Sequence, residues 1–96
     1  MKSKILKWAS EKGILEHGDP KTQMLKIVEE VGEASQQILK QDTFKLMSEL
    51  GDIQIALTIL AELCNLDIDK CTKYSLRKNR DRKGQMKNGT FEKEAN

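Results

Sequence analysis

The sequence is poor in the residues that usually stabilise a small protein on its own. Among its 96 residues there are only one tryptophan, one tyrosine, two phenylalanines and two cysteines. The length allows one small domain, and a third of the residues are charged, so the hydrophobic core must be thin. We therefore expect a bound metal ion or a partner chain to contribute to stability.

Long apolar segments are also absent. The N-terminal residues Met1-Lys2-Ser3-Lys4 lead into no apolar run that is long enough for a signal peptide or a membrane span. The two cysteines, Cys64 and Cys71, have no further cysteine or neighbouring histidine with which to complete a zinc site. We expect a cytoplasmic protein without membrane contact, whose reduced thiols pack as small apolar side chains.

Charge is distributed unevenly along the chain. The formal net charge is only +2, but eight basic residues lie between Lys70 and Lys87, with Asp81 as the only acid among them. This asymmetry indicates an anionic ligand at the basic end, although several of these residues can equally form a solvated face. The only histidine, His17, precedes Gly18 and is expected in a turn, without a catalytic role.

Capping residues and apolar periodicity predict helices throughout most of the chain. Asp19 followed by Pro20 is a helix start, because a carboxylate caps the helix and proline suits its first position. Asp42 or Thr43, and later Asp67, can cap two further helices. The expected helices cover about residues 4–12, 20–40, 44–65 and 68–83.

The domain boundary is predicted near Gly84, which is expected to end the last helix. Residues 85–96 are polar, with Phe91 as their only large aromatic residue, and no strand is expected there. They are predicted to form an extended tail, either wrapped on a partner subunit or disordered. The prediction is an all-α fold over residues 1–84, a helical bundle of about four helices, followed by a C-terminal tail over 85–96.

One flank of the second predicted helix is polar along its length. Its apolar seam consists of Met24, Ile27, Val31, Ala34 and Ile38, which recur at spacings of three and four residues. Beside the seam runs a polar column of Gln23, Lys26, Glu30, Glu33 and Gln37. Such a column either lines a cleft or is a solvated face on which Lys26 and Glu30 form an ion pair one turn apart.

The third predicted helix carries two acids on its apolar side. Its wet side is expected to be the stripe of Gln54, Thr58 and Glu62. Glu49 and Asp52 project away from this stripe, where an unpaired carboxylate is costly. We expect a metal ion as their partner rather than a basic side chain, because one lysine cannot match several converging acids. The wide apolar surface of this helix also predicts pairing with a second chain.

The acids of the two helices share one spacing. Glu30 and Glu33, and then Glu49 and Asp52, lie three residues apart, so each pair places both carboxylates on one side of its helix. If the two helices pack together, four or more carboxylate oxygens converge on one point. An oxygen-rich site of this kind suits Mg²⁺ or Mn²⁺ rather than zinc.

Taken in order, these residues resemble a known family. Lys26, Glu29-Glu30-x-x-Glu33 and Glu49-x-x-Asp52 resemble the signature of the MazG-like nucleoside triphosphate pyrophosphohydrolases of the all-α NTP pyrophosphatase superfamily. The similarity to the small single-domain members extends to Trp8-Ala9, to Asp19-Pro20-Lys21-Thr22-Gln23 and to Arg82-Lys83-Gly84-Gln85-Met86.

The resemblance implies hydrolysis of a nucleoside triphosphate between its α- and β-phosphates, which gives the monophosphate and pyrophosphate and serves nucleotide-pool house-cleaning. It also implies a homodimer or homotetramer whose helices complete a four-helix-bundle core. The metal ligands it implies, for Mg²⁺ or its substitute Mn²⁺, are Glu30, Glu33, Glu49 and Asp52. Glu29 would hold metal or activate water. The substrate-binding residues would be Lys26, Lys78 and Arg82 for the phosphates, and Gln23 and Trp8 near the base.

Two other functional classes remain open from the residues themselves. The basic stretch of residues 77–83 could bind nucleic acid, with an affinity that falls steeply as salt is added. That hypothesis leaves the inward-facing acids unexplained, so nucleic acid is not the expected partner. The chain could also be a catalytically inactive helical interaction protein, in which Trp8 is only a core anchor. The complete set of acids argues against this alternative.

Overall fold

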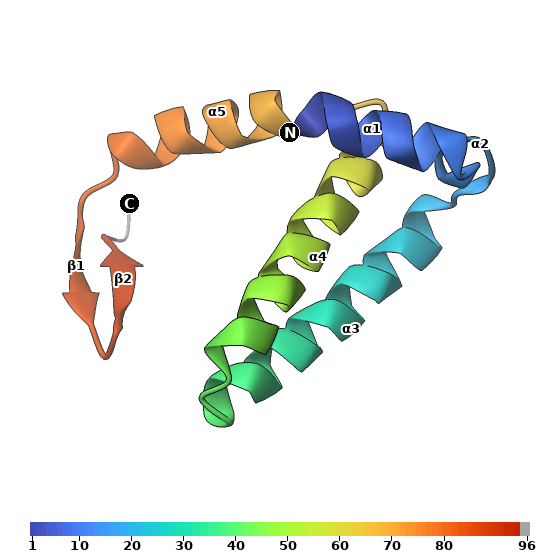
Figure 1. The fold of residues 1–96 in the computed structure, drawn as a ribbon. Coiled ribbons are helices and arrows are strands. Elements are labelled where there is room, and N and C mark those ends of the chain that lie inside the picture. The colour runs from blue at the N-terminus through green and yellow to red at the C-terminus, as the bar shows by residue number, and fades with distance from the viewer. Residues whose placement is uncertain (95–96) are drawn as a thin grey trace.

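Helices dominate the structure, as the sequence predicts. The computed structural model describes residues 1–94, and Figure 1 shows the order of their elements along the chain. The helices are α1 (Lys2–Glu11), α2 (Ile14–His17), α3 (Pro20–Leu39), α4 (Thr43–Leu63) and α5 (Ile68–Arg80), and the strands are β1 (Gly84–Lys87) and β2 (Thr90–Lys93). Within residues 1–94, no helix is both long enough and apolar enough to cross a membrane.

Three aspartates begin the long helices, as their positions in the sequence predict. The Asp19 carboxylate accepts hydrogen bonds from the Thr22 backbone N–H at 3.0 Å and from the Thr22 hydroxyl at 2.9 Å, and Pro20 follows it. The Asp42 carboxylate accepts from the Lys45 backbone N–H at 3.0 Å. Asp67 caps α5 in the same way. Each cap satisfies backbone donors that have no partner inside the helix.

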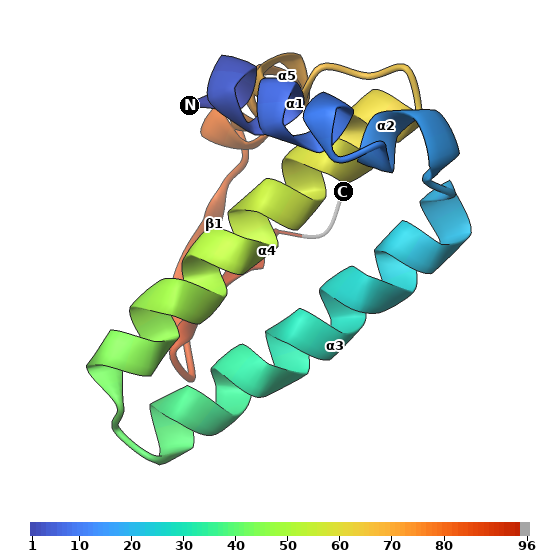
Figure 2. The ribbon, with the colours of Figure 1, turned by 45° about the vertical axis from the view of Figure 1, so that its right-hand side comes forward.

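Helices α3 and α4 lie side by side and antiparallel, and they form the long axis of the molecule (Figures 1 and 2). A tight turn joins them. Gln41 takes a left-handed conformation with φ 57°, and the Asp42 N–H donates to the Gln37 carbonyl at 3.0 Å. A loop this short holds the two helices against each other, so their facing side chains must form either a core or a cleft.

The best-packed part of the core lies where α1 crosses the C-terminal half of α4 (Figure 2). Its buried centre consists of Ile5, Ala9 and Ile59, against which Ile14, Leu15, Ile55 and Leu63 pack. A salt bridge closes this end, because the Lys2 Nζ lies 2.7 Å from an Asp67 carboxylate oxygen. Their hydrogen bond raises the pKa of Lys2 and lowers the pKa of Asp67. The pair therefore ties the start of α1 to the start of α5.

The side of α3 that faces α4 differs from the predicted seam. Ile27 and Ala34 are buried, but Val31 and Ile38 are 50% and 63% exposed. The half-buried residues on this side are instead Gln23, Glu30 and Gln37, from the polar column.

The prediction for the wet side of α4 was wrong at Thr58, which is only 2% exposed. Its hydroxyl can be buried because it donates to the Gln54 carbonyl at 2.8 Å.

The C-terminal segment is a β-hairpin, so the prediction of a tail without strands was wrong. Strands β1 and β2 pair antiparallel, with Met86 opposite Phe91. Asn88 and Gly89 form the turn with φ of 52° and 82°, and an Asn-Gly pair favours this hairpin turn. Helix α5 ends at Arg80, with Asp81 as its C-cap, so it does not continue to Gly84 as predicted. The predicted tail ends with residues 95–96, which lie outside the described residues.

Two smaller predictions also need correction. His17 ends the short helix α2 instead of lying in a turn, and its side chain is exposed. Cys71 is half-buried, but Cys64 is exposed and does not pack in the core.

Gly18 is a position where the fold has no space for a side chain. A Cβ there would collide with the Ile14 carbonyl oxygen and would come within 3.2 Å of the Leu63 methyl groups. We expect Gly18→Ala to lower the free energy of unfolding by about 2 kcal/mol, because the backbone must shift to relieve the overlap. Thermal or urea denaturation followed by circular dichroism measures this change.

A substitution of opposite sign serves as the control. Gln41 has a left-handed conformation that costs a non-glycine residue about 1 kcal/mol, so Gln41→Gly should raise the free energy of unfolding by that amount. Equal stability of the Gly18→Ala variant and the parent would show that the turn before α3 can move freely.

Candidate functional site

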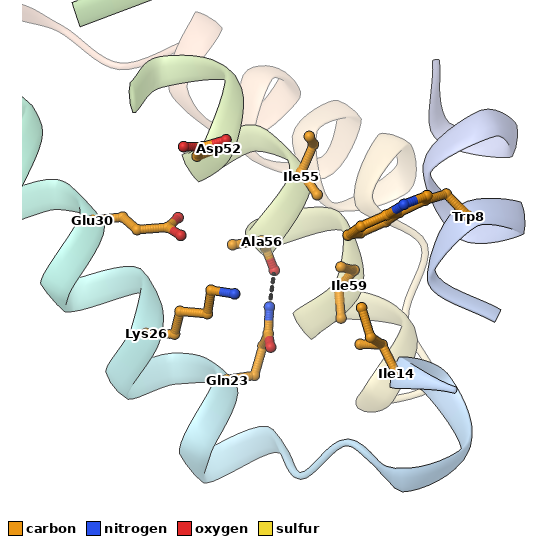
Figure 3. Close-up of a pocket in the computed structure, with 9 residues that line it drawn as sticks. All are labelled: Trp8, Ile14, Gln23, Lys26, Glu30, Asp52, Ile55, Ala56 and Ile59. Carbon is orange, nitrogen blue, oxygen red and sulfur yellow. Dashed lines mark hydrogen bonds between the residues drawn. The ribbon is translucent and has the colours of Figure 1, made fainter. Parts of the chain in front are cut away.

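A cavity of about 410 Å³ lies between α3 and α4 and is closed at one end by α1 and α2 (Figure 3). Its walls are formed by Trp8, Ile14, Gln23, Lys26, Glu30, Asp52, Ile55, Ala56 and Ile59. Five of these are residues that the sequence analysis selected as site residues, and they come from three different helices. The cavity therefore exists because α1 packs across the open end of the α3–α4 hairpin.

One end of the cavity is apolar. Trp8 reaches in from α1 toward Ile55 and Ile59 of α4, and Ile14 of α2 lies opposite (Figure 3). Gln23 of α3 stands at the edge of this apolar end, where its Nε2 donates to the Ala56 carbonyl at 3.0 Å. Trp8 is 45% exposed, so it is a wall of the cavity more than an anchor of the core. A flat, mostly apolar ligand group would fit here.

The other end of the cavity is charged. Glu30 of α3 and Asp52 of α4 point toward each other across the gap, with the Lys26 amine nearby (Figure 3). Glu30 and Lys26 also line a second hollow of about 470 Å³ on the surface of α3, together with Glu29 and Glu33. The acids of α3 thus lie on one side of the helix, and Glu30 lines both spaces.

The carboxylates of the two helices act on one another electrostatically. Burial raises the pKa of Glu30 above its ordinary value, and the negative charges of Asp52, Glu33 and Glu29 raise it further, against the lowering effect of Lys26. Burial also raises the pKa of Glu49, and the charges of Glu33, Asp52 and Glu30 add to this. Acids from both helices therefore share one region of negative potential, as their spacing in the sequence predicts.

The protein itself compensates the acidic end only in part, through the charge of Lys26. One carboxylate oxygen of Glu30, Oε2, is buried without a hydrogen-bond partner. Within residues 1–94, Lys26 makes no salt bridge with any of the acids. A buried carboxylate oxygen without a partner is costly, so this end is suited to a cation that the protein does not supply.

The donor set fits a hard divalent cation such as Mg²⁺, since all its atoms are carboxylate oxygens. The residues that could hold it are Glu30, Glu33, Glu49 and Asp52. As the side chains stand in residues 1–94, no three acidic, histidine or cysteine side chains are grouped closely enough to hold a metal ion. A cation that binds here would have to draw these carboxylates together.

The two basic residues near the C-terminus lie apart from the cavity. Lys78 is on α5, which runs away from the α3–α4 hairpin (Figure 1), and its amine lies 5.9 Å from the centre of the Tyr74 ring. Arg82 follows the end of α5, so it does not project beside Lys78 as one continuous helix would require. Neither residue lines the cavity. A single copy of residues 1–94 therefore does not bring these cations to the acids.

The sequence analysis missed four residues that line the cavity. These are Ile14, Ile55, Ala56 and Ile59. Ile55 and Ile59 are one helical turn apart, so a shared face could be foreseen from the sequence. That this face lines the cavity depends on where α1 crosses α4. Because this contact joins distant parts of the chain, the sequence pattern does not show it.

The raised pKa values predict how the stability of the metal-free protein depends on pH. In the folded state Glu30 and Glu49 hold protons above their ordinary pKa of 4.5, at pH values where the unfolded chain has lost them. The free energy of unfolding should therefore fall as pH rises through this window. Melting temperatures measured in a chelator from about pH 5 to about pH 8 report this dependence of stability on pH. The dependence should be weaker in Glu49→Gln.

Asp67 sets the acid limit of this trend. Its lowered pKa stabilises the fold above the ordinary value of 3.8, and this contribution is lost as the pH falls through the lowered pKa. Added Mg²⁺ should raise the melting temperature more at the alkaline end of the range, because the acids must lose their protons to bind it. A melting temperature that rises steadily with pH in the chelator would contradict the assignment of Glu30 and Glu49.

Comparison with known proteins identifies the family. A family model described as the MazG nucleotide pyrophosphohydrolase domain matches residues 19–86. The match covers more than half of the chain and includes the acids of α3 and α4 together with Lys78 and Arg82, whereas Trp8 lies before it. Comparisons with curated proteins and with solved structures found no match. The chain belongs to the MazG nucleotide pyrophosphohydrolase domain family.

Proposed function

We propose that the protein is a Mg²⁺-dependent pyrophosphohydrolase that cleaves nucleoside triphosphates between the α- and β-phosphates and so removes unwanted nucleotides from the cytoplasmic pool. The observation that carries this proposal is the layout of the cavity. An apolar end with an aromatic wall adjoins an acidic end whose Glu30 carboxylate has an unpartnered oxygen. A nucleotide has the same division, with a flat base at one end and phosphates, which bind Mg²⁺, at the other.

The chain's own residues suggest how the reaction is assisted. Glu30, Glu33, Glu49 and Asp52 would hold Mg²⁺, which when bound offsets the charge of the triphosphate. Lys26, whose amine lies at the cavity wall, would bind a phosphate oxygen. Glu29 lines the second hollow beside Glu30, from which it could take the proton of the attacking water. The walls from α1 and α2 would hold the base and exclude water from it.

A second copy of the chain is part of this proposal. The outer faces of α3 and α4 expose large apolar side chains, namely Met24, Leu25, Val28, Val31 and Ile38 on α3 and Phe44, Met47 and Leu50 on α4. This many large apolar side chains exposed on two neighbouring helices favour an interaction site. A matching pair of helices from a second copy would cover it and complete a four-helix bundle.

Two glycines support close approach of another chain. Gly32 and Gly51 lie inside α3 and α4, where glycine costs about 1 kcal/mol relative to alanine. Apart from the adjoining residues and backbone of the same helix, nothing in residues 1–94 lies within 4 Å of a Cβ placed at either position, so packing among these residues does not require the glycines. In a dimer or a tetramer, α5 of one copy could also bring Lys78 and Arg82 to the phosphates bound by another.

Product analysis tests the proposed reaction. The protein is incubated with a panel of ribo- and deoxyribonucleoside triphosphates and Mg²⁺, and the products are separated by ion-exchange chromatography. The expected products are the monophosphate and pyrophosphate in equal amounts. Formation of diphosphate and orthophosphate, or no turnover of any nucleotide, would overturn the proposal. Omission of Mg²⁺ in the presence of a chelator is the matched control.

A further inference from the structure

The orientation of the Gln23 side-chain amide is determined by its partner. A backbone carbonyl can only accept a hydrogen bond, so the atom 3.0 Å from the Ala56 carbonyl oxygen must be the amide nitrogen. The nitrogen is thereby engaged with α4. The other atom of the amide, Oε1, receives no hydrogen bond from residues 1–94 and is not buried. Gln23 therefore offers an oriented acceptor at the wall of the cavity.

The surroundings of this acceptor are suited to the faces of a flat ring. Trp8, Ile14, Ile55 and Ile59 present an indole and branched aliphatic groups, which bind ring faces and accept no conventional hydrogen bonds (Figure 3). Among these side chains the indole N–H is the only polar group, and it is a donor. At the apolar end, Gln23 Oε1 is thus the side-chain atom that can accept a hydrogen bond from a ring edge.

The distance along α3 places this acceptor correctly for a base. Gln23 and Glu30 are seven residues apart on the same helix, which corresponds to about two turns and a rise of about 10 Å. Lys26 lies between them on the cavity wall. A ligand whose phosphates lie at Glu30 would therefore extend past Lys26 and place its base beside Gln23.

We propose that Gln23 makes the site selective for bases with an amino group at pyrimidine C4 or purine C6, cytosine and adenine, over bases with an oxo group at that position. The inference rests on the proposed nucleotide function and adds a substrate class to it. At the same corner of the ring, an amino group donates a hydrogen bond to Oε1, whereas a carbonyl oxygen faces it with its own lone pairs. In an oxo base the ring N–H stands next to the carbonyl group. If this N–H donated to Oε1 instead, the carbonyl oxygen of the base would also come near Oε1.

Matched substrate pairs test this selectivity. The value of kcat/KM is measured for dCTP against dUTP and for dATP against dITP, which differ mainly in an amino or oxo group at one ring position. We expect kcat/KM to be about tenfold higher for the amino member of each pair. The amino group gains one hydrogen bond to Oε1, whereas the oxo group of the other member is repelled by it. In Gln23→Met, which keeps the length of the side chain but not its amide, both ratios should fall toward one.

Binding provides a second readout that does not require turnover. Trp8 is the only tryptophan of the chain and lines the cavity, so a stacked base should quench its fluorescence. Titration with dCMP and dUMP should show tighter binding of dCMP, and Gln23→Met should remove the difference. Gln36→Met, an exposed position on the same helix, is the control and should keep the difference. Circular dichroism verifies that both variants retain the fold.

The outcomes separate this inference from the proposed function. Turnover of all four nucleotides at equal kcat/KM would overturn the base selectivity alone, as would equal losses for all four in Gln23→Met. Absence of turnover would overturn the proposed reaction, and the fluorescence titration would then decide the selectivity by itself. Equal quenching by dCMP and dUMP, or none by either, would overturn it.

Discussion

Glu33→Gln and Asp52→Asn are each expected to lower kcat/KM for the nucleoside triphosphate by about three orders of magnitude. Removing one charged metal ligand costs several kcal/mol of the stabilisation that the metal gives to the transition state. The two substitutions keep the size of the side chain and remove only its charge. Glu33 is exposed and Asp52 faces the cavity, so neither change disturbs the buried core. Steady-state kinetics at saturating Mg²⁺ measure the loss, and circular dichroism confirms the helical content.

The control for charge alone is Glu62→Gln. Glu62 is an exposed acid on α4, the helix that also carries Asp52, but it lies outside the cavity. Its substitution should leave kcat/KM within a factor of about two, because a surface charge this far away is screened by salt. Full activity in both the Glu33 and the Asp52 variants would show that the proposed metal ligands are not part of the reaction.

Val31→Glu is expected to convert an oligomer into a monomer and to abolish most activity. Val31 is 50% exposed in a single chain and lies among the apolar side chains on the outer face of α3. In a symmetric dimer each substitution occurs in both copies, so two unpaired carboxylates would be buried at the interface. The dissociation constant should rise by at least about a thousandfold, since each buried charge costs several kcal/mol.

Sedimentation equilibrium or light scattering on a sizing column measures the molar mass. The control is Leu66→Glu, at a residue that is 55% exposed in the break between α4 and α5, away from the outer face of α3. This variant should keep the mass of the parent. A parent protein that is monomeric at the concentrations used in the assay, and fully active there, would contradict the role given to a second copy.

Local chemistry explains which parts of the fold could be read from the residues. The caps at Asp19, Asp42 and Asp67 depend only on neighbouring backbone N–H groups, so they mark helix starts regardless of the remaining structure. The C-terminal hairpin was missed although Asn88-Gly89 is itself a local turn signal. The flanking strands are short and neither has a buried face, so no apolar alternation accompanied that turn.

The orientation of α3 shows where sequence patterns stop being sufficient. The apolar seam and the polar column lie side by side on one helix, and both have the same periodicity. Part of the polar column, Gln23, Glu30 and Gln37, is half-buried on the side that faces α4. Val31 and Ile38 of the apolar seam remain exposed. A periodic pattern identifies an apolar side without identifying what covers it, and a second copy can cover such a side as well as another helix of the same chain.

By itself, the sequence determined the long helices and the spacing of the acids, because caps and side-chain direction follow from the nearest four residues. Only the tertiary structure decided that Trp8 and three isoleucines line the end of the acid-bearing cleft, and that Lys78 and Arg82 lie away from it. The physical reason is that these outcomes depend on where α1 crosses α4 and on the direction in which α5 leaves it. Contacts between residues far apart in the chain set those directions.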